Sequence, residues 1–518
     1  MKYRFLEDDR SLKERICQLN GIDPTELEIS AFLNMQEIPE VVAFKETILD
    51  NREKRYLIVG DYDCDGICAT VIIKRLLDRL NILNNYIIPS RSRQGYGLNE
   101  EIVNNAHEYH FDIILCVDNG VTAYEPIKLA KEHGIQVFVI DHHEYSELPD
   151  FEALLHPNLL PEAYHDMCAA GLCALLSDHF DYDELSAVYG GLATIADMVP
   201  VLRYNRYLIK RMYDILKTED ILPIRYLLND AELDYESLSY TVIPKINAIS
   251  RLEELMNVNH MVRYLLENDP SCRQYLGYIE KINRIRKEDT RLMYDSVKAS
   301  IRDEDSFLLI RSDTFKEGLC GLLANRLMNE YHKPVVILSE KEGELKGSGR
   351  SPAGFDLYTY LKVFSELFHT FGGHEQAVGL SLSTDDYERL KEDIRNNPCV
   401  IPEKMQDVLL IDSDKIDPGL LSQLEALQPY GTSFKEPLFA MRNVSYASRF
   451  LVARKYPKFV ISRQLEAISF DPSDANKPFD TMIGRIKRDR YHKNRISFVI
   501  EELLQFYYNL DISKEVTL

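Results

Sequence analysis

Three short apolar segments between residues 56 and 140 each end in a cluster of acidic or imidazole side chains. The segment 56–59 runs into GDYDCDG, the segment 112–117 into DNG, and the segment 136–140 into DHH. Stretches of helical periodicity, among them ICATVIIKRLLDRL and AYEPIKLAKEHG, separate these segments. Strands that alternate with helices in this way form βαβ units and therefore a parallel sheet. Because the carboxyl ends of parallel strands line one crevice, we expect the polar clusters to meet there.

The first cluster places Asp61, Asp63 and Asp65 at alternate positions directly after its strand. Alternation puts the three carboxylates on one side of an extended segment, where their repulsion is costly unless a cation binds. A calcium loop of the EF-hand type needs Glu six residues after the glycine, and Ile72 stands there instead, so that interpretation fails. Capping of the following helix explains one carboxylate but not three.

Further polar residues add to the same crevice. They are Asp118, Asp141, His142 and His143, together with Asp197 of the helical segment ATIADMVP. Each of them alone is more typical of a turn, a helix cap or a satisfied core histidine, so the inference rests on their combination. Oxygen-rich ligands with one or two imidazoles favour Mn²⁺ or Mg²⁺, and this many carboxylates can neutralise two ions. Two such ions are the usual apparatus for displacement at phosphorus.

A second α/β unit starts near Phe307. The segments SFLLIRS, LCGLLANRLMNEY, KPVVILSE and ELKGSGRS predict strand, helix, strand and strand. Ser348 and Arg350 of KGSGRS offer a hydroxyl and a guanidinium to a phosphate, although a Gly-Ser-Gly turn by itself more often forms an ordinary hairpin. His374 in the sequence GGH has a similar simple alternative, an incidental residue beside a glycine turn.

The chain beyond the Pro-containing segment 398–404 changes character. Short β-rich segments separated by turns follow, and they predict an all-β domain small enough for a five-stranded barrel. Residues 441–518 carry a net charge of +5, whereas residues 1–440 carry −27. The total of −22 over 518 residues argues against a generic nucleic-acid coat or a basic membrane-surface protein.

Cysteine usage and hydropathy indicate the compartment. Nine cysteines without a zinc or disulfide pattern predict reduced thiols. Because the sequence shows neither a signal peptide nor a long apolar run, we expect a cytoplasmic protein with no membrane partner.

The motifs DYDCDG, VDNG, DHH and ADMVP, in this order and at these spacings, resemble those of the DHH phosphoesterase superfamily. GYG, PKINAISR, KGSGRS and GGHEQAVG narrow the resemblance to the RecJ family of single-strand-specific 5′ to 3′ DNA exonucleases, over essentially the whole chain. It implies an α/β protein with two α/β domains, DHH and DHH-associated, joined by a long helix and followed by an all-β, OB-fold-like domain. The implied parts are a helical N-terminal segment (1–48), a DHH catalytic domain (49–215), a helical connector (216–304), a DHH-associated domain (305–400), and a junction with an OB-fold-like DNA-binding domain (401–518).

The resemblance also implies roles for individual residues. Two Mn²⁺ or Mg²⁺ ions per active site would be bound by Asp61, Asp63, Asp65, Asp118, His142 and Asp197. Asp118, which would bridge the two ions, and His143, which would face the scissile phosphate, would be the catalytic residues. The DNA and its 5′-phosphate would be held by Arg91, Arg251, Ser348, Arg350 and His374.

Together these roles imply a metal-dependent exonuclease that degrades single-stranded DNA from its 5′ end and releases 5′ mononucleotides, in DNA repair and recombination. One alternative is a DHH phosphodiesterase acting on short RNA or cyclic dinucleotides, although such relatives usually lack the β-rich C-terminal domain. Another is a non-catalytic replication scaffold, although such relatives have lost metal ligands. Single-stranded DNA is the expected partner, single-strand-binding protein and helicases are further candidates, and the chain is expected to act as a monomer.

Overall fold

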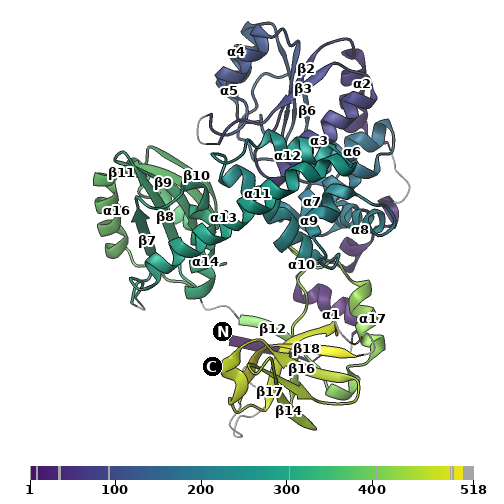
Figure 1. Ribbon diagram of the computed structural model, residues 1–518, viewed down its shortest axis with the longest axis vertical. Helices are drawn as coiled ribbons and strands as arrows, with labels where there is room; N and C mark the ends of the chain where they lie inside the picture. The colour runs from purple at the N-terminus through teal and green to yellow at the C-terminus, as the bar shows by residue number, and fades with distance from the viewer. Residues whose placement is uncertain are drawn as a thin grey trace. The chain divides into compact units, whose positions relative to one another are not determined.

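The computed structural model describes residues 2–7, 10–32, 37–91, 94–302, 304–402, 405–489, 492 and 495–505. The chain forms two compact units (Figure 1). The larger unit comprises Gln36–Asp197 and Arg211–Pro402. The smaller unit comprises Met1–Met35, Met198–Lys210 and Glu403–Leu518. No helix of the described residues is long and apolar enough to cross a membrane.

The larger unit begins with the expected parallel sheet. Its order is β3-β2-β4-β5-β6, and all neighbouring strands are parallel. The strands are β2 (Tyr56–Val59), β3 (Asn84–Ile87), β4 (Ile113–Val117), β5 (Gln136–Ile140) and β6 (Ala153–Leu155). The sequence predicted β2, β4 and β5, which are almost wholly buried apolar runs. It missed β3 and β6, because NNYI is half polar and ALL is only three residues long.

Helices cover both faces of this sheet. They are α2 (Pro39–Asp50), α3 (Cys64–Arg79), α4 (Glu100–Glu108), α5 (Tyr124–Glu132), α6 (Ala169–Phe180) and α7 (Glu184–Ala196). Leu57, Ile114 and Val137 pack in one core cluster with residues of α4 and α5. Phe138, whose side chain has the opposite orientation from Val137, stacks edge-on against Phe44 of α2. The sheet is therefore a buried layer whose polar chemistry is confined to the strand ends.

A helical connector follows. It contains the end of α8 (Arg203–Thr218) and α9 (Leu222–Leu228), α10 (Tyr235–Ser237), α11 (Ile243–Arg251), α12 (Asn259–Leu266) and α13 (Arg273–Lys298). The helix expected at 271–300 is α13, a highly charged helix that buries a stripe including Ile279, Ile282 and Met293. It packs against α11 and against α14 of the next domain.

The second α/β domain has a mixed sheet of order β10-β11-β9-β8-β7. Its elements are β7 (Leu308–Ser312), α14 (Glu317–Tyr331), β8 (Val335–Lys341), β9 (Glu344–Arg350), α15 (Leu357–Lys362), β10 (Thr370–His374), β11 (Ala377–Ser383) and α16 (Thr384–Asn396). Strands β7 and β8 are parallel and connected through α14, as the sequence predicted, whereas β8, β9, β11 and β10 pair antiparallel.

The smaller unit is built on an eight-stranded sheet of order β1-β12-β13-β17-β18-β16-β15-β14. Its elements are β1 (Lys2–Leu6), α1 (Leu12–Leu19), β12 (Met405–Leu410), α17 (Pro418–Ala426), β13 (Phe439–Arg442), β14 (Ser448–Val452), β15 (Tyr456–Val460), β16 (Leu465–Ser469), β17 (Thr481–Arg488) and β18 (Ile496–Leu504). The expected all-β character is confirmed, but the sheet is larger than the five strands expected. Residues 506–518 lie outside the described residues.

The N-terminal segment 1–48, expected to be helical, contains α1 and most of α2 but begins with a strand. Residues 2–6 form β1, which pairs parallel to β12 at the edge of the sheet. Tyr3 and Phe5 alternate with polar residues and pack against a core cluster that contains Val408 and Ala440. A period of two is the signal of a half-buried strand, but its partner strand lies about 400 residues away in the sequence.

Residues 198–210 also depart from the expected boundaries, because they belong to the smaller unit rather than to the catalytic domain of 49–215. Arg206 explains the difference. Its guanidinium is buried and donates to three successive carbonyls, those of Leu427, Gln428 and Pro429, at 2.6, 3.0 and 2.9 Å. A buried arginine that satisfies three backbone acceptors ties this segment to the β-rich unit.

Candidate active site

The DYDCDG segment links β2 to α3. Asp63 is the N-cap of α3, and its Oδ1 accepts hydrogen bonds from the backbone N–H groups of Asp65 and Gly66 at 2.9 and 3.1 Å. Gly66 has no space for a side chain, since a Cβ there would lie 2.5 Å from the carbonyl oxygen of Asp61. The close approach of these backbones turns the Asp61 and Asp63 side chains toward the strand ends.

Asp65 is fixed from a different direction. Its carboxylate accepts hydrogen bonds from the backbone N–H groups of Ala169 and Ala170, at 2.9 and 2.8 Å, at the start of α6. These are unpaired helix-terminal donors, and the helix dipole favours a negative charge there. Asp65 is therefore held in one orientation, as a preorganised ligand must be.

Asp118 follows β4 in the left-handed region, with a φ of 62°. Asp and Asn tolerate this conformation better than other residues with a side chain. The backbone N–H of Asp118 donates to the carbonyl of Ile140 at 2.9 Å, which joins the ends of β4 and β5. Its Oδ1 lies 3.3 Å from His142 Nε2 yet accepts no hydrogen bond from a described residue. A buried carboxylate oxygen without a partner is a free ligand position.

Three groups of ligand atoms result, each with all its atoms within 4.8 Å of one another. One contains Asp61, Asp63 and Asp118, and another contains Asp65, His142 and Asp197. The third combines Asp118 and His142 with His143. Each of the six residues expected to bind metal belongs to at least one of the first two groups. Asp118 of the first group and His142 of the second both belong to the third group. The first two groups, which we call the two cages, therefore lie next to each other.

The electrostatics of these groups require a counter-charge. Burial, and then the neighbouring carboxylates, raise the pKa of Asp118 well above its usual value. The pKa of Asp61 is also raised well above normal by burial and by Asp63, and burial followed by Asp65 and Asp63 raises the pKa of Asp197 to about 8. Buried like charges have this effect, and a divalent cation would reverse it. Asp61, like Asp118, keeps an Oδ1 without a hydrogen bond from the described residues.

His143, a member of the third group, pairs with Asp141, which belongs to none of the three. Asp141 is fully buried, and its Oδ1 lies 2.7 Å from His143 Nδ1 and accepts the backbone N–H of His142 at 2.8 Å. Burial opposes protonation of His143, but the bond and charge of Asp141 outweigh it and raise the His143 pKa to about 9. Asp141, which the sequence placed in the crevice, therefore orients the histidine rather than offering a free ligand atom.

The sequence singled out GYG only as a motif and overlooked the role of Tyr96. The Tyr96 hydroxyl donates to the backbone carbonyl of Asp118 at 2.7 Å and lies 3.2 Å from the ring nitrogens of His143. The flanking Gly95 and Gly97 have positive φ values of 82° and 62°. Two glycines around an aromatic residue were the available signal, because they mark a loop shaped to present that side chain.

Three of the residues expected to hold phosphate, Arg251, Ser348 and Arg350, lie around the N-terminal part of α14, and the charge of Arg91 acts on Arg251. Arg251 Nη1 donates to the carbonyl of Gly318 at 3.2 Å. A Cβ at Gly321 would lie 3.3 Å from Arg350 Nη2 and 3.5 Å from Ser348 Oγ. Burial, and then the charges of Arg91, Arg286 and Arg350, lower the Arg251 pKa to about 10. Guanidinium groups gathered close enough to repel one another favour an anion between them.

His374 stands apart from this group. It ends β10, pairs with Ala377 of β11 and is exposed, and no described contact joins it to another of the expected site residues. Its expected place beside the DNA path therefore stays a prediction.

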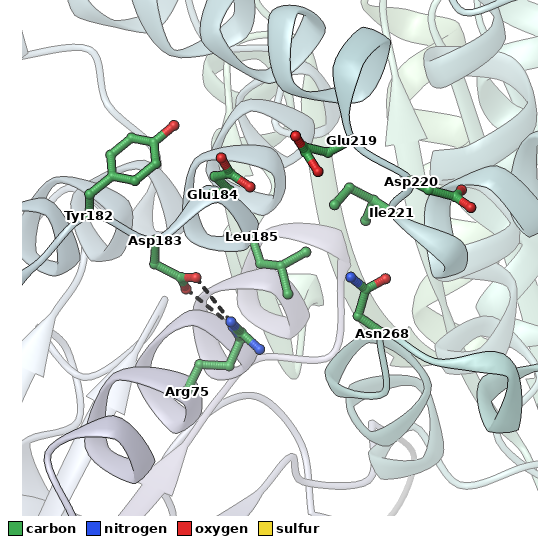
Figure 2. A pocket seen from close by; sticks show the side chains of 9 residues that line it. All are labelled: Arg75, Tyr182, Asp183, Glu184, Leu185, Glu219, Asp220, Ile221 and Asn268. Atoms are coloured by element: carbon green, nitrogen blue, oxygen red, sulfur yellow. Dashed lines mark hydrogen bonds and ion pairs between the residues drawn. The ribbon is translucent and has the colours of Figure 1, made fainter.

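A cavity of about 390 Å³ lies elsewhere in the larger unit (Figure 2). Asp183 and Arg75 form an ion pair at 2.9 Å in its wall, and Glu184, Glu219 and Asp220 add further carboxylates. None of the expected site residues lines it. Its acidic wall would repel phosphate, so the strand-end site is the better candidate for chemistry on nucleic acid.

Comparison with known proteins agrees with this geometry. The DHH family N-terminal domain matches residues 55–196, the DHHA1 domain matches 304–397, and the RecJ OB domain matches 409–502. The single-stranded-DNA-specific exonuclease RecJ of Dickeya dadantii is 30% identical over 445 residues, which cover 77% of this chain and 76% of that protein. The chain belongs to the RecJ family. The predicted family and fold class are thereby confirmed.

Other RecJ proteins match over most of this chain. RecJ of Bacillus subtilis is 27% identical and covers 82% of this chain, which spans 57% of that longer protein. Among solved structures, RecJ from Thermus thermophilus in complex with Mn²⁺ has a TM-score of 0.82 at 22% identity. The match covers 98% of this chain and 80% of the Thermus chain. An exonuclease RecJ bound to manganese has a TM-score of 0.61 at 25% identity, with 71% and 96% of the two chains covered.

Proposed function

We propose that this RecJ-family chain is a metal-dependent exonuclease that degrades single-stranded DNA from its 5′ end and releases 5′ mononucleotides. The observation that carries the proposal is the pairing of two adjoining carboxylate-rich cages with a nearby group of arginines in the larger unit. The cages suit cations that act at a phosphodiester, and the arginines suit a phosphate at the end of the strand. Together they specify cleavage at a fixed distance from a phosphorylated end.

The donor set fits Mn²⁺ or Mg²⁺. Five carboxylates and one imidazole would hold two ions: Asp61, Asp63 and Asp118 on one side, Asp65, His142 and Asp197 on the other. When bound, the ions would supply Lewis-acid activation of water and stabilisation of charge at phosphorus. Two RecJ structures were solved with Mn²⁺ and one with Mg²⁺, which supports the same choice here.

The chain's own residues do the positioning. His143, kept protonated by Asp141, would donate to a non-bridging oxygen of the scissile phosphate as its negative charge grows. Arg251, Arg350, Ser348 and Arg91 would hold the terminal 5′-phosphate and so set which bond reaches the cages. We expect the separation between the arginines and the cages to admit one nucleotide, which would account for release of mononucleotides.

A time course on one oligonucleotide tests the direction and the substrate. A 5′-labelled and a 3′-labelled single strand are digested with Mn²⁺ or Mg²⁺, beside duplex, RNA and chelator controls. We expect the 5′ label to appear as a mononucleotide in the earliest samples, while the 3′ label passes through a ladder of shortening strands. Earlier release of the 3′ label would contradict the direction, and preferential loss of RNA or of cyclic dinucleotides would favour the DHH phosphodiesterase alternative.

Single-strand-binding protein and helicases are proposed as protein partners on the family resemblance alone, as are action as a monomer and a place in the cytoplasm. Sedimentation of the full chain with and without DNA checks the oligomeric state.

A further inference from the structure

Helix α13 carries an arginine that no motif assigned to the site. The guanidinium of Arg286 donates from Nε and Nη2 to Oδ1 of Asn283, at 3.1 and 2.9 Å. Asn283 is 5% exposed and faces inward from the helix. A buried amide that accepts from two donors of one guanidinium fixes its plane without neutralising its charge.

The charge of Arg286 has no carboxylate counterpart among the residues that the structure describes. Arg291, farther along α13, shows the usual alternative: it pairs with Glu288 and Asp295 at 2.6 and 2.7 Å. In an acidic chain, an arginine that bonds to a neutral amide and to no carboxylate loses solvation of its charge without gaining an ion pair. This cost is offset if the arginine binds an anion.

The neighbours of Arg286 supply the place for that anion. Helix α13 packs against α11, which ends at Arg251, and against α14, whose glycines face Arg251 and Arg350. The charge of Arg286 is among the causes that lower the Arg251 pKa, together with those of Arg91 and Arg350. As with Arg286, no carboxylate ion pair holds Arg91, Arg251 or Arg350 within the described ranges.

The glycines of α14 allow these elements to approach closely. A Cβ at Gly318 would lie 2.3 Å from the carbonyl oxygen of Arg251, and a Cβ at Gly321 would approach Arg350 and Ser348. Small residues at both positions let α11 and β9 come close to the helix. Helices α11, α13 and α14 and strand β9 thus meet where the arginines gather.

We propose that Arg286, oriented by Asn283, is a fourth arginine of the terminal-phosphate site and makes the enzyme discriminate 5′-phosphorylated from 5′-hydroxyl DNA. This inference rests on the proposed exonuclease function and adds a specificity-determining residue on the connecting helix. Four guanidinium groups exceed the charge of one dianionic phosphate, so the site favours the phosphorylated end strongly over an uncharged hydroxyl.

The test compares kcat/KM on the same single strand with a 5′-phosphate and with a 5′-hydroxyl. In the unaltered chain we expect the phosphorylated strand to be preferred, and in Arg286→Gln we expect this preference to fall about tenfold or more. Arg286→Lys keeps the charge but loses the paired hydrogen bonds to Asn283, so its preference for the phosphorylated strand should lie between those of the unaltered chain and Arg286→Gln. Asn283→Ala should lower the preference about threefold, because it frees the guanidinium to rotate.

Arg284→Gln is the matched control, since Arg284 is an exposed arginine two positions away on the same helix, and its preference should equal that of the unaltered chain. Thermal unfolding checks that every variant is folded. An equal loss on both substrates in Arg286→Gln and Arg286→Lys, or no preference in the unaltered chain, would overturn the inference while exonuclease activity persists. Failure to digest either strand in the unaltered chain would instead refute the proposed function.

Discussion

Asp118 combines a position in the proposed metal site with several features that oppose folding. Its backbone is left-handed, its side chain is buried, and its Oδ1 accepts no hydrogen bond from any described residue. Each feature costs folding free energy, and residues that keep such costs are typically found at functional sites. The same carboxylate belongs to one proposed cage and lies 3.3 Å from the imidazole of the other.

The substitution Asp118→Asn should remove the charge while tolerating the left-handed backbone. We expect nuclease activity to fall by about 10³-fold or more, because a carboxylate of one cage that lies next to the other cage is lost. Without metal, the variant should unfold at the same temperature or a higher one, since repulsion among buried carboxylates is relieved.

Thermal unfolding with and without Mn²⁺ checks both parts of this prediction. Mn²⁺ at about 100 times its Kd should add about 2.7 kcal/mol to the free energy of unfolding of the unaltered chain, and much less to the variant. Retained Mn²⁺-dependent digestion of single strands by Asp118→Asn would contradict the assigned role.

Tyr96→Phe removes one hydroxyl and keeps the ring. Because that hydroxyl bonds to the Asp118 carbonyl and contacts His143, we expect kcat to fall about tenfold with KM nearly unchanged. Tyr109→Phe, an exposed tyrosine outside the site, is the control. If KM rises and kcat is unchanged, Tyr96 binds DNA rather than positioning the catalytic groups.

At the scale of elements, α14 joins the residues proposed to hold phosphate into one group. It begins after β7 and brings Gly318 and Gly321 against Arg251, Ser348 and Arg350, which come from α11 and β9. The sequence predicted α14 correctly from its periodicity but gave no reason for its glycines. The reason is tertiary, since only the packed neighbours show which glycine has space beside it.

Gly321→Val should fill the space beside Arg350 and Ser348. We expect KM for 5′-phosphorylated DNA to rise about tenfold, because the branched side chain displaces the guanidinium from the phosphate. Gly277→Val on α13 is the matched control, and its KM should not change, since a Cβ there meets nothing within 4 Å. Steady-state kinetics measure both, and equal KM values in the two variants would argue against the placement of the phosphate.

At the scale of the whole molecule, the net charge of −22 is compatible with DNA binding only if positive charge is local. The arginines around α14 are one such place, and the smaller unit is a candidate for another. There, Arg488 pairs with Glu425 and Lys487 lies 3.7 Å from Glu436, which leaves the hairpin between β14 and β15 as the more available basic site. It bears Arg454 and Lys455, beside Tyr456 and the exposed Phe470.

The double substitution Arg454→Gln with Lys455→Gln should weaken binding of single-stranded DNA. We expect the slope of log K against log salt to become shallower by about 1.4, the value for two lost phosphate contacts on a single strand. Lys128→Gln with Arg52→Gln removes the same charge from exposed positions of the larger unit and serves as control. An unchanged salt slope would exclude the hairpin from the DNA path. Truncation is a poorer test, because the smaller unit is assembled from three separate segments.

Short-range patterns in the sequence determined many of the strands and helices of this protein and the residues of its proposed metal site. Alternating apolar runs and helical periods predicted β2, β4, β5 and α14, and the polar residues that end those strands predicted the metal cages. These features follow from local chemistry, because a parallel sheet always gathers its carboxyl ends at one edge. The tertiary structure alone decided the rest. It paired β1 with β12, joined residues 198–210 to the β-rich unit through Arg206, turned Asp141 toward His143, and packed α13, which carries Arg286, against α11 and α14. Each of these depends on which distant or neighbouring groups a side chain meets after folding, and periodicity carries no information about that choice.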